Sequence, residues 1–323
     1  VRWDLIIIDE AHKMSAYKYG DKIDKRKRYR VGELLSETTN HLIFLTATPH
    51  RGDEENFRLF IDLLSPGMFA NIDLLKESVA NKDNPLFLRR LKEDLKDFQG
   101  KPLFPPRNVQ TISFKLNDEE KGLYNAVTTF VQQYFDKAKE RRNIAFALMI
   151  LQRRLSSSIR AVRLSLDRRK KRLEEFLRMP ELFEENKEEL HKLYRLREDD
   201  IENYSESEIW ELEKKLELLT IAENIDDVKK EIEEINQLII KAREAEKKEI
   251  ESKLYSLKER ILSNIAENKL LIFTEFRDTL EYLVDKIKSW DYKVNFIHGG
   301  MNLDSRIEAE KEFKHNAQIM VAT

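Results

Sequence analysis

Short apolar runs that end in polar residues lie near both ends of the chain. Residues 5–8 read Leu-Ile-Ile-Ile and lead into Asp9-Glu10-Ala11-His12. Residues 42–45 read Leu-Ile-Phe-Leu and lead into Thr46-Ala47-Thr48-Pro49. A continuous apolar run of this length is typical of a strand buried on both faces of a parallel sheet. The pattern therefore predicts an α/β fold with polar groups at the carboxyl ends of its strands, where such sheets bind ligands.

The last part of the chain repeats this pattern. Three apolar runs each precede a polar or glycine residue: 270–273 before Thr274, 294–297 before His298-Gly299-Gly300, and 319–322 before Thr323. Amphipathic segments at 279–290 and 305–313 separate the runs and predict helices. Strands that alternate with single helices predict parallel pairing in one sheet.

Local signals place further elements. Apolar residues on one face predict a helix over 53–64, and residues 109–114 predict a strand. Asn117 and Asn224 each precede acidic residues in the pattern of a helix start.

The middle of the chain differs in composition from both ends. Residues 123–298 contain no glycine, and Pro180 is their only proline, which predicts an almost purely helical region. Its charge is divided. Residues 137–172 hold 13 basic and two acidic residues, a net of +11, whereas residues 174–267 hold 28 acidic and 16 basic residues, a net of −12.

The acidic half carries an apolar stripe in a coiled-coil-like spacing of four and three residues. The stripe consists of Val228, Ile232, Ile235, Ile239 and Ala242, and it resumes at Ile250, Leu254, Leu257 and Ile261. A single helix cannot bury such a seam, so the spacing predicts a helical hairpin or a small bundle. Core packing is the favoured interpretation of this stripe, and a partner site is the alternative.

Composition excludes several classes of protein. The 323 residues contain no cysteine, which excludes disulfides and thiolate metal sites, and the six histidines show no ligand spacing. The sequence has neither a signal peptide nor an apolar run near the roughly 20 residues that a membrane span needs. These features predict a cytoplasmic protein with no membrane partner.

The order of the strand-end motifs resembles that of the superfamily 2 helicase-like ATPases. The segment 45–53, Leu-Thr-Ala-Thr-Pro-His-Arg-Gly-Asp, is similar to the Swi/Snf class of DNA translocases within that superfamily. Residues 151–158, Leu-Gln-Arg-Arg-Leu-Ser-Ser-Ser, resemble the RapA-like branch of the class. The resemblance covers about residues 1–170 and 268–323.

This resemblance implies parts of two RecA-like lobes around a helical insertion. Residues 1–112 would form the C-terminal part of the first lobe, 113–268 a helical protrusion, and 269–323 the N-terminal part of the second lobe. ATP and Mg²⁺ are the implied cofactors. Double-stranded DNA is the implied partner, together with RNA polymerase or another DNA-bound protein.

The site residues follow from the same resemblance. Asp9 would hold magnesium through water and Glu10 would polarise the attacking water, roles that suit an acidic pair at a strand end. Three residues would couple nucleotide state to lobe movement: His12, Thr46 and Thr48. A second set would lie near the phosphates of one DNA strand: Thr274, His298, Gly299, Gly300, Arg306 and Thr323. For Arg306 a structural tie to the glycine turn is an equal alternative.

The basic segment 137–172 leaves two interpretations open. Its cations, Arg153 and Arg154 among them, could contact the DNA backbone. Alternatively, the acidic segment 174–267 could neutralise them within the protein.

Two family features are missing from this sequence. The phosphate-binding loop G-x-x-x-x-G-K-[ST] does not occur, and the only Gly-Lys pair, Gly100-Lys101, has Leu95 and Pro102 at the other required positions. The final arginine motif is also missing. We therefore expect an ATP-dependent DNA translocase or remodeller of protein–DNA complexes in the full-length parent, and no hydrolysis by residues 1–323 alone. The alternative function is a non-enzymatic helical module that docks a partner protein.

Overall fold

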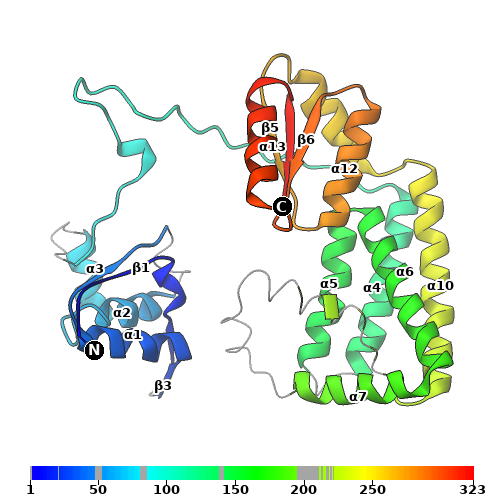
Figure 1. Cartoon of the computed structure of the whole chain (residues 1–323), viewed down its shortest axis with the longest axis horizontal. Coiled ribbons are helices and arrows are strands. Elements are labelled where there is room, and N and C mark those ends of the chain that lie inside the picture. Colours follow the sequence, from blue (N-terminus) through cyan, green and yellow to red (C-terminus); the bar gives the residue numbers. More distant parts are fainter. Residues whose placement is uncertain are drawn as a thin grey trace. The chain divides into compact units, whose positions relative to one another are not determined.

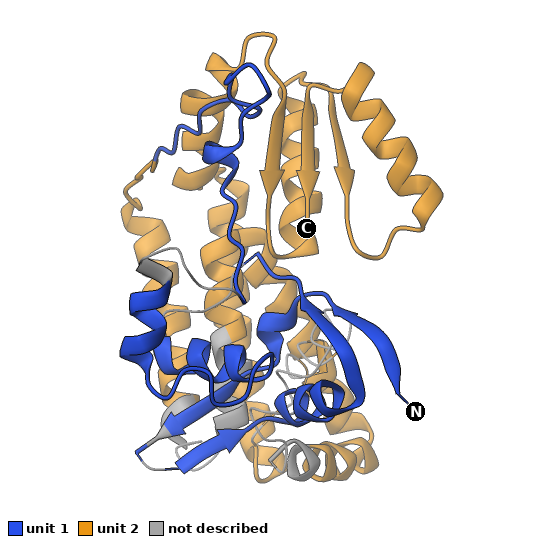
Figure 2. Ribbon diagram, turned by 90° about the vertical axis from the view of Figure 1, so that its left-hand side faces the viewer, with its two compact units in different colours: residues 1–110, 197–205 blue, residues 111–196, 206–323 orange. Residues whose placement is uncertain are grey.

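The computed structural model describes residues 2–20, 22–47, 53–80, 86–137, 142–194, 211, 214–215, 218, 220 and 222–323. The chain forms two compact units, which Figure 2 colours separately. Unit 1 covers Val1–Gln110, and unit 2 covers Thr111–Leu196 and Glu206–Thr323. The segment Arg197–Ser205 is grouped with unit 1 but lies outside the described residues.

Unit 1 is built on a parallel strand pair, as the apolar runs predict. The predicted burial of both strand faces is wrong, because Ile8 and Phe44 pack against the core whereas Ile7 and Ile43 on the other face are 57% and 44% exposed. Strand β1 (Trp3–Ile8) pairs with β4 (Thr39–Phe44), and Ile7 lies opposite Ile43. Between them the chain forms the antiparallel hairpin β2 (Ala16–Tyr19) and β3 (Lys22–Lys25) and then helix α1 (Lys27–Thr38). The parallel pairing brings the carboxyl ends of β1 and β4 to the same edge.

Two helices complete unit 1 (Figure 1). Helix α2 (Glu54–Asp62) begins where predicted, because the Asp53 side chain accepts a hydrogen bond from the Asn56 N–H. Helix α3 (Ile72–Ala80) follows. The core of the unit is made by apolar side chains of β2, α1, α2, α3 and the segments between them: Ala11, Ala16, Tyr29, Phe57, Leu59, Phe60, Ile61, Leu63, Phe69 and Leu75.

The strand predicted over 109–114 is wrong. These residues have no regular secondary structure, and Val109 is 73% exposed. Within the described part of the chain no strand pairs with them. Arg260 Nη1 donates a hydrogen bond to the Ser113 carbonyl at 2.9 Å. Alternation of apolar and polar residues fits an extended chain, but a strand also needs a neighbour for its backbone groups.

Unit 2 begins with a helical bundle. Its long helices are α4 (Asp118–Lys137), α5 (Arg142–Ser157), α6 (Ile159–Arg178), α7 (Pro180–Tyr194) and α10 (Ile225–Lys247). Both predicted helix starts are confirmed. Asn117 and Glu120 form a reciprocal capping box, in which each side chain accepts from the other's backbone N–H. The Asn224 side chain accepts from the N–H groups of Asp226 and Asp227.

The apolar stripe of the acidic half is buried in this bundle. Val228, Ile235 and Ala242 are fully buried where α10 packs against α6. The small-bundle interpretation is therefore correct for this part of the stripe. After α10, Glu249 adopts a left-handed φ of 52°, and the chain continues through the short helix α11 (Ser252–Ser256) into a π-helical segment (Leu257–Ile261). The second part of the stripe therefore does not extend the same helix.

A three-stranded parallel sheet completes unit 2. Strands β5 (Leu270–Phe273), β6 (Val294–Ile297) and β7 (Ile319–Ala322) lie in the order β5-β7-β6. Helices α12 (Arg277–Ser289) and α13 (Leu303–His315) connect them. This is the strand–helix alternation that the sequence predicts. Helix α12 also packs against α6, which places the bundle and the sheet in one compact unit.

None of the helices within the described ranges is long and apolar enough to cross a lipid bilayer.

A buried ion pair joins α6 to α10. Arg169 Nε donates to Glu231 Oε1 at 2.7 Å, and the two side chains are 5% and 0% exposed. Thr220 Oγ1 also donates to Glu231, at 2.5 Å. We predict that Glu231→Ala lowers the free energy of unfolding by about 3–5 kcal/mol, since it removes a carboxylate that pairs with the buried Arg169 charge. Urea unfolding measures this, and the double variant Arg169→Met, Glu231→Leu should lose less. A double variant less stable than the single one would contradict the prediction.

A second buried carboxyl predicts an unusual pH dependence. Burial raises the pKa of Glu251 from 4.5 to about 7. The folded state holds the proton of Glu251 more tightly than the unfolded state does. The contribution of this proton to the free energy of unfolding is fully present below the unfolded pKa of 4.5, and it is lost as pH rises through the folded pKa of about 7. Glu251→Gln should therefore raise the melting temperature at pH 8 and change it little at pH 4.5.

The exposed neighbour Glu249 is the matched control. Its hydrogen bond to Lys286 lowers its pKa, so Glu249→Gln should not stabilise the protein at pH 8. Equal melting temperatures of wild type and Glu251→Gln across pH 4.5–8 would contradict the burial effect.

Candidate functional site

The acidic pair lies at the carboxyl end of β1, as expected. Glu10 adopts a left-handed φ of 49°, and its N–H donates to Asp9 Oδ1 at 2.8 Å. Both residues are exposed. The left-handed residue turns the chain sharply after the strand and leaves the two carboxylates at the sheet edge. A non-glycine residue in this conformation is strained and is often found at functional sites.

A hydrogen bond joins the loop after β1 to the loop after β4. His12 Nδ1 lies 2.9 Å from Thr46 Oγ1 and 3.2 Å from Glu10 Oε2. Two backbone bonds support this contact, from Ala11 N to the Leu45 carbonyl and from Leu45 N to the Ile8 carbonyl. Three of the predicted residues, Glu10, His12 and Thr46, are thus brought together. Thr48, the other predicted coupling residue, lies outside the described residues.

The donor chemistry of this edge fits magnesium bound together with phosphates. Asp9 and Glu10 supply hard carboxylate oxygens, and Mg²⁺ commonly takes one or two carboxylates while water and phosphate oxygens complete its shell. No group of three or more acidic or histidine ligands occurs among the residues that the structure describes. The edge therefore suits a metal that arrives with a nucleotide.

The Gly100-Lys101 pair has no role in phosphate binding of the loop-to-helix kind. Gly100 has a φ of 81° and lies in a tight turn, in which Asp97 Oδ1 accepts from the N–H groups of Gln99 and Lys101. An isolated bridge between Lys96 and Pro102 closes the turn. A phosphate-binding loop instead leads from a strand into a helix N-terminus.

In unit 2 the predicted nucleic-acid residues lie along one edge of the sheet. Phe273 and Ile297 both lie opposite Ala322 in the strand register, so the residues that follow them share the carboxyl edge. Thr274 N donates to the Ala322 carbonyl at 2.9 Å, and Thr323 N donates to the Ile297 carbonyl at 3.1 Å. Thr274, His298 and Thr323 are therefore neighbours at this edge.

The glycine turn after β6 is held by two side chains. The Gly300 N–H donates to His298 Nδ1 at 3.1 Å, and Arg306 Nη2 donates to the Gly299 carbonyl at 2.5 Å. Partial burial and the nearby Arg277 charge lower the pKa of His298, which favours the neutral imidazole that accepts this bond. Arg306 was predicted either to contact a phosphate or to tie its helix to the glycine turn, and the hydrogen bond to Gly299 is such a tie. A Cβ at Gly299 would meet no atom within 4 Å, so that face of the turn is open.

Arg153 and Arg154 contact the loop that follows β5. We call residues 153–158, where α5 ends and α6 begins, the α5–α6 corner, and residues 274–279 the β5–α12 loop. Arg153 forms an ion pair with Glu275, and Arg154 Nη1 donates to Asp278 Oδ2 at 2.7 Å. Both guanidinium groups also lie over the Phe276 ring.

Two residues of this region escaped the sequence interpretation. Asp278 and Thr279 stand in the first turn of α12, where polar residues are common as helix starts. Their spacing after β5 gave no separate signal, since their partners lie more than 100 residues earlier in the chain.

Comparison with known protein families gives two matches. Residues 1–167 match the family described as "SNF2-related domain", and residues 252–323 match "Helicase conserved C-terminal domain". Residues 168–251, which include most of the acidic segment, lie between the two matched regions.

Individual relatives are more distant. The "Uncharacterized ATP-dependent helicase YqhH" of Bacillus subtilis is 28% identical over 177 residues, which cover 51% of this chain and 29% of that protein. The "RNA polymerase-associated protein RapA" of Pseudomonas fluorescens (strain SBW25) is 27% identical over 125 residues, which cover 39% of this chain and 12% of that protein. The chain thus spans less than a third of the relatives it matches.

Among solved structures, the "Sulfolobus solfataricus SWI2/SNF2 ATPase core in complex with dsDNA" is 16% identical with a TM-score of 0.32. The match covers 100% of this chain and 54% of that one.

Proposed function

Because this chain belongs to the SNF2-related family, whose match covers more than half of it, we propose that it is part of an ATP-dependent translocase on double-stranded DNA. Hydrolysis of ATP drives movement along the duplex or remodels protein–DNA complexes. The single observation that best supports this is the His12–Thr46 hydrogen bond beside the acidic pair. It links the loop that carries the carboxylates to the next strand end, where a change at the nucleotide can be passed on.

In this proposal each residue of the β1 edge has a distinct task. Asp9 would hold a magnesium ion, and Glu10 polarises the attacking water. The ion would supply positive charge that offsets the charge of the phosphates. His12 contacts both Glu10 and Thr46, so it couples the state of the nucleotide to the loop after β4. Thr48 shares that coupling role.

The carboxyl edge of the three-stranded sheet in unit 2 contacts the DNA backbone. Thr274, Thr323 and the turn 298–300 present hydroxyl and backbone N–H groups, which suit phosphate oxygens and carry no sequence preference. The open face at Gly299 supports a close backbone approach. Arg306 holds the turn, and its charge adds to the attraction for phosphate.

The proposal for the protein partner of the whole protein rests on sequence similarity. RapA is described as RNA polymerase-associated, and the similarity over 125 residues supports a polymerase or another DNA-bound protein as the second partner. A cytoplasmic location is part of the same proposal.

A non-enzymatic docking module has less support. Its charged helices would need free charge on their surface, whereas Arg163 and Arg169 of α6 pair with Glu246 and Glu231 of α10. Part of the charge asymmetry of the sequence is therefore satisfied inside unit 2.

We predict that Glu10→Gln in the full-length parent protein lowers DNA-stimulated ATP hydrolysis by about 10²–10⁴-fold. The substitution removes the group that polarises the attacking water. Nucleotide binding should be retained, because the amide keeps the size of the side chain. Steady-state hydrolysis with and without duplex DNA, beside calorimetric titration with ATP, measures both quantities. The exposed Glu37→Gln serves as the control, and full activity of Glu10→Gln would refute the assignment.

A further inference from the structure

We propose that the α5–α6 corner is a positioning device that fixes the β5–α12 loop, and through it the Thr274 hydroxyl, for contact with a DNA phosphate. The residues that position the loop are Ser157, Ser158 and Thr279 through hydroxyl contacts, and Arg154 and Arg168 through Asp278. This inference rests on the proposed function, in which Thr274 contacts DNA.

Contacts with the bundle run along the whole loop. Five of the six loop residues contact α5 or α6. Thr274 and Thr279 contact the serines of the corner, and Glu275 pairs with Arg153. Phe276 lies under Arg153 and Arg154, and Asp278 pairs with Arg154 and Arg168. The remaining residue, Arg277, donates to Glu281 on its own helix. A chance packing contact would not include nearly every residue of a loop.

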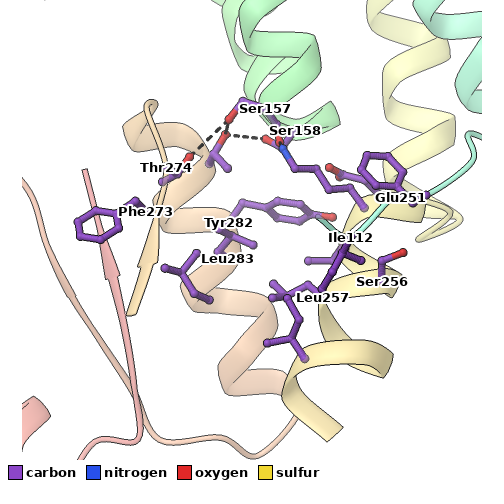
Figure 3. A pocket seen from close by; sticks show the side chains of 16 residues that line it. Ile112, Ser157, Ser158, Glu251, Ser256, Leu257, Phe273, Thr274, Tyr282 and Leu283 are labelled. Carbon is purple, nitrogen blue, oxygen red and sulfur yellow. Dashed lines mark hydrogen bonds between the residues drawn. The ribbon is translucent and has the colours of Figure 1, made fainter. Parts of the chain in front are cut away.

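The hydroxyl groups form a connected chain (Figure 3). Thr279 Oγ1 lies 2.7 Å from Ser157 Oγ and 2.9 Å from Ser158 Oγ. Ser157 Oγ in turn lies 3.5 Å from Thr274 Oγ1. Thr279 and Ser158 are only 4% and 2% exposed, so these contacts are shielded from bulk solvent. These contacts hold the Ser157 hydroxyl beside the Thr274 hydroxyl.

Asp278 fixes the same loop by charge. It receives Arg154 Nη1 at 2.7 Å and Arg168 Nη2 at 2.8 Å on Oδ2, and Arg168 Nη1 at 3.3 Å on Oδ1. Two arginines from consecutive helices on one carboxylate hold the start of α12 against the corner. The Asp278 side chain is 19% exposed, so these charge-assisted bonds are partly shielded from solvent.

A cavity of about 240 Å³ adjoins the loop. Its lining includes Ser157, Ser158, Thr274, Thr279, Tyr282 and Leu283. Phe273, the last residue of β5, is 75% exposed. Beside this cavity, polar contacts from the corner act on the loop together with the packing of Phe276, which is 5% exposed.

The device joins two regions that have separate family matches. The corner lies within residues 1–167, which match the SNF2-related domain, and the loop lies within 252–323, which match the helicase C-terminal domain. Lys253 strengthens the junction, since its Nζ donates to the carbonyls of Ser156 and Ser157 at the end of α5. Movement of the bundle is thereby passed directly to the edge that carries Thr274.

The same geometry separates the roles of the two adjacent arginines. The Arg154 side chain is 10% exposed and faces Asp278, which makes it a positioning residue. The Arg153 side chain is 40% exposed, so it keeps a surface that can reach a phosphate while it pairs with Glu275.

Two substitutions at Thr279 test the proposal. Thr279→Val keeps the shape of the side chain and removes the hydroxyl, whereas Thr279→Ser keeps the hydroxyl and removes a buried methyl. Filter binding of the full chain to duplex DNA measures affinity, and thermal melting of the same samples measures stability. If the hydroxyl positions Thr274, the Val variant should bind DNA about threefold to tenfold more weakly, as expected for one lost hydrogen bond. The Ser variant should bind like wild type even if it melts earlier.

Thr274→Val and the double variant Thr274→Val, Thr279→Val complete the test. If Thr279 acts through Thr274, the double variant should bind no more weakly than Thr274→Val alone. An affinity that follows melting temperature across both Thr279 variants would overturn the proposal, as would two losses that multiply. If Thr274→Val weakens binding and Thr279→Val does not, the positioning role is wrong and the DNA contact stands. If Thr274→Val binds DNA like wild type, the proposed contact fails and the inference fails with it.

A salt titration separates positioning from direct phosphate contact. Arg154→Gln should weaken binding without changing the slope of log affinity against log salt, because no counterion is released at a buried arginine. A direct contact would flatten the slope by about 0.9 for each phosphate lost. Flattening with Arg154→Gln would overturn its assignment as a positioning residue.

Discussion

Helix α6 holds the second compact unit together, because it pairs its cations with two different acidic neighbours. On one side Arg163 and Arg169 contact Glu246 and Glu231 of α10. On another Arg168 contacts Asp278 of α12. Apolar residues of the same helix, such as Val162 and Leu166, are fully buried between these contacts. Bundle and sheet are therefore not independent bodies, since one helix supplies the packing surface and the charge partners of both.

These ion pairs change the interpretation of the basic segment 137–172. A net charge of +11 over 36 residues suggests a polyanion as ligand when it is considered alone. In the folded chain several of these cations have carboxylate partners at 2.7–3.3 Å, and Arg169 is almost fully buried. Such pairs hold elements in register and specify their orientation. Charge that is used this way contributes to nucleic-acid binding only indirectly, through the groups that it positions.

The sequence was sufficient wherever the determining interaction is local. Asn117 and Asn224 start their helices through side-chain bonds to N–H groups two or three residues later, and both starts were predicted. The strand-end motifs were also predicted, because a continuous apolar run is typical of a strand in a parallel sheet, although β1 and β4 are partly buried on one face only. Residues 109–114 have the composition of a strand, but whether a segment finds a pairing neighbour is decided far away in the chain. The same limit hid Asp278, whose function depends on arginines 110 and 124 residues earlier.

The two sheet edges use one physical arrangement. In each, a threonine directly or closely follows a strand of a parallel sheet, and a polar side chain from another segment contacts its hydroxyl: His12 at Thr46 in unit 1, and Ser157 at Thr274 in unit 2. A threonine hydroxyl both donates and accepts, so it can hold one protein contact and still offer a lone pair or proton to a ligand. The contact fixes the rotamer, and the ligand then meets a group whose orientation entropy has already been lost. Thr274 gains its contact from a bundle that also carries the charge pairs of α6, so its orientation depends on how that bundle is packed.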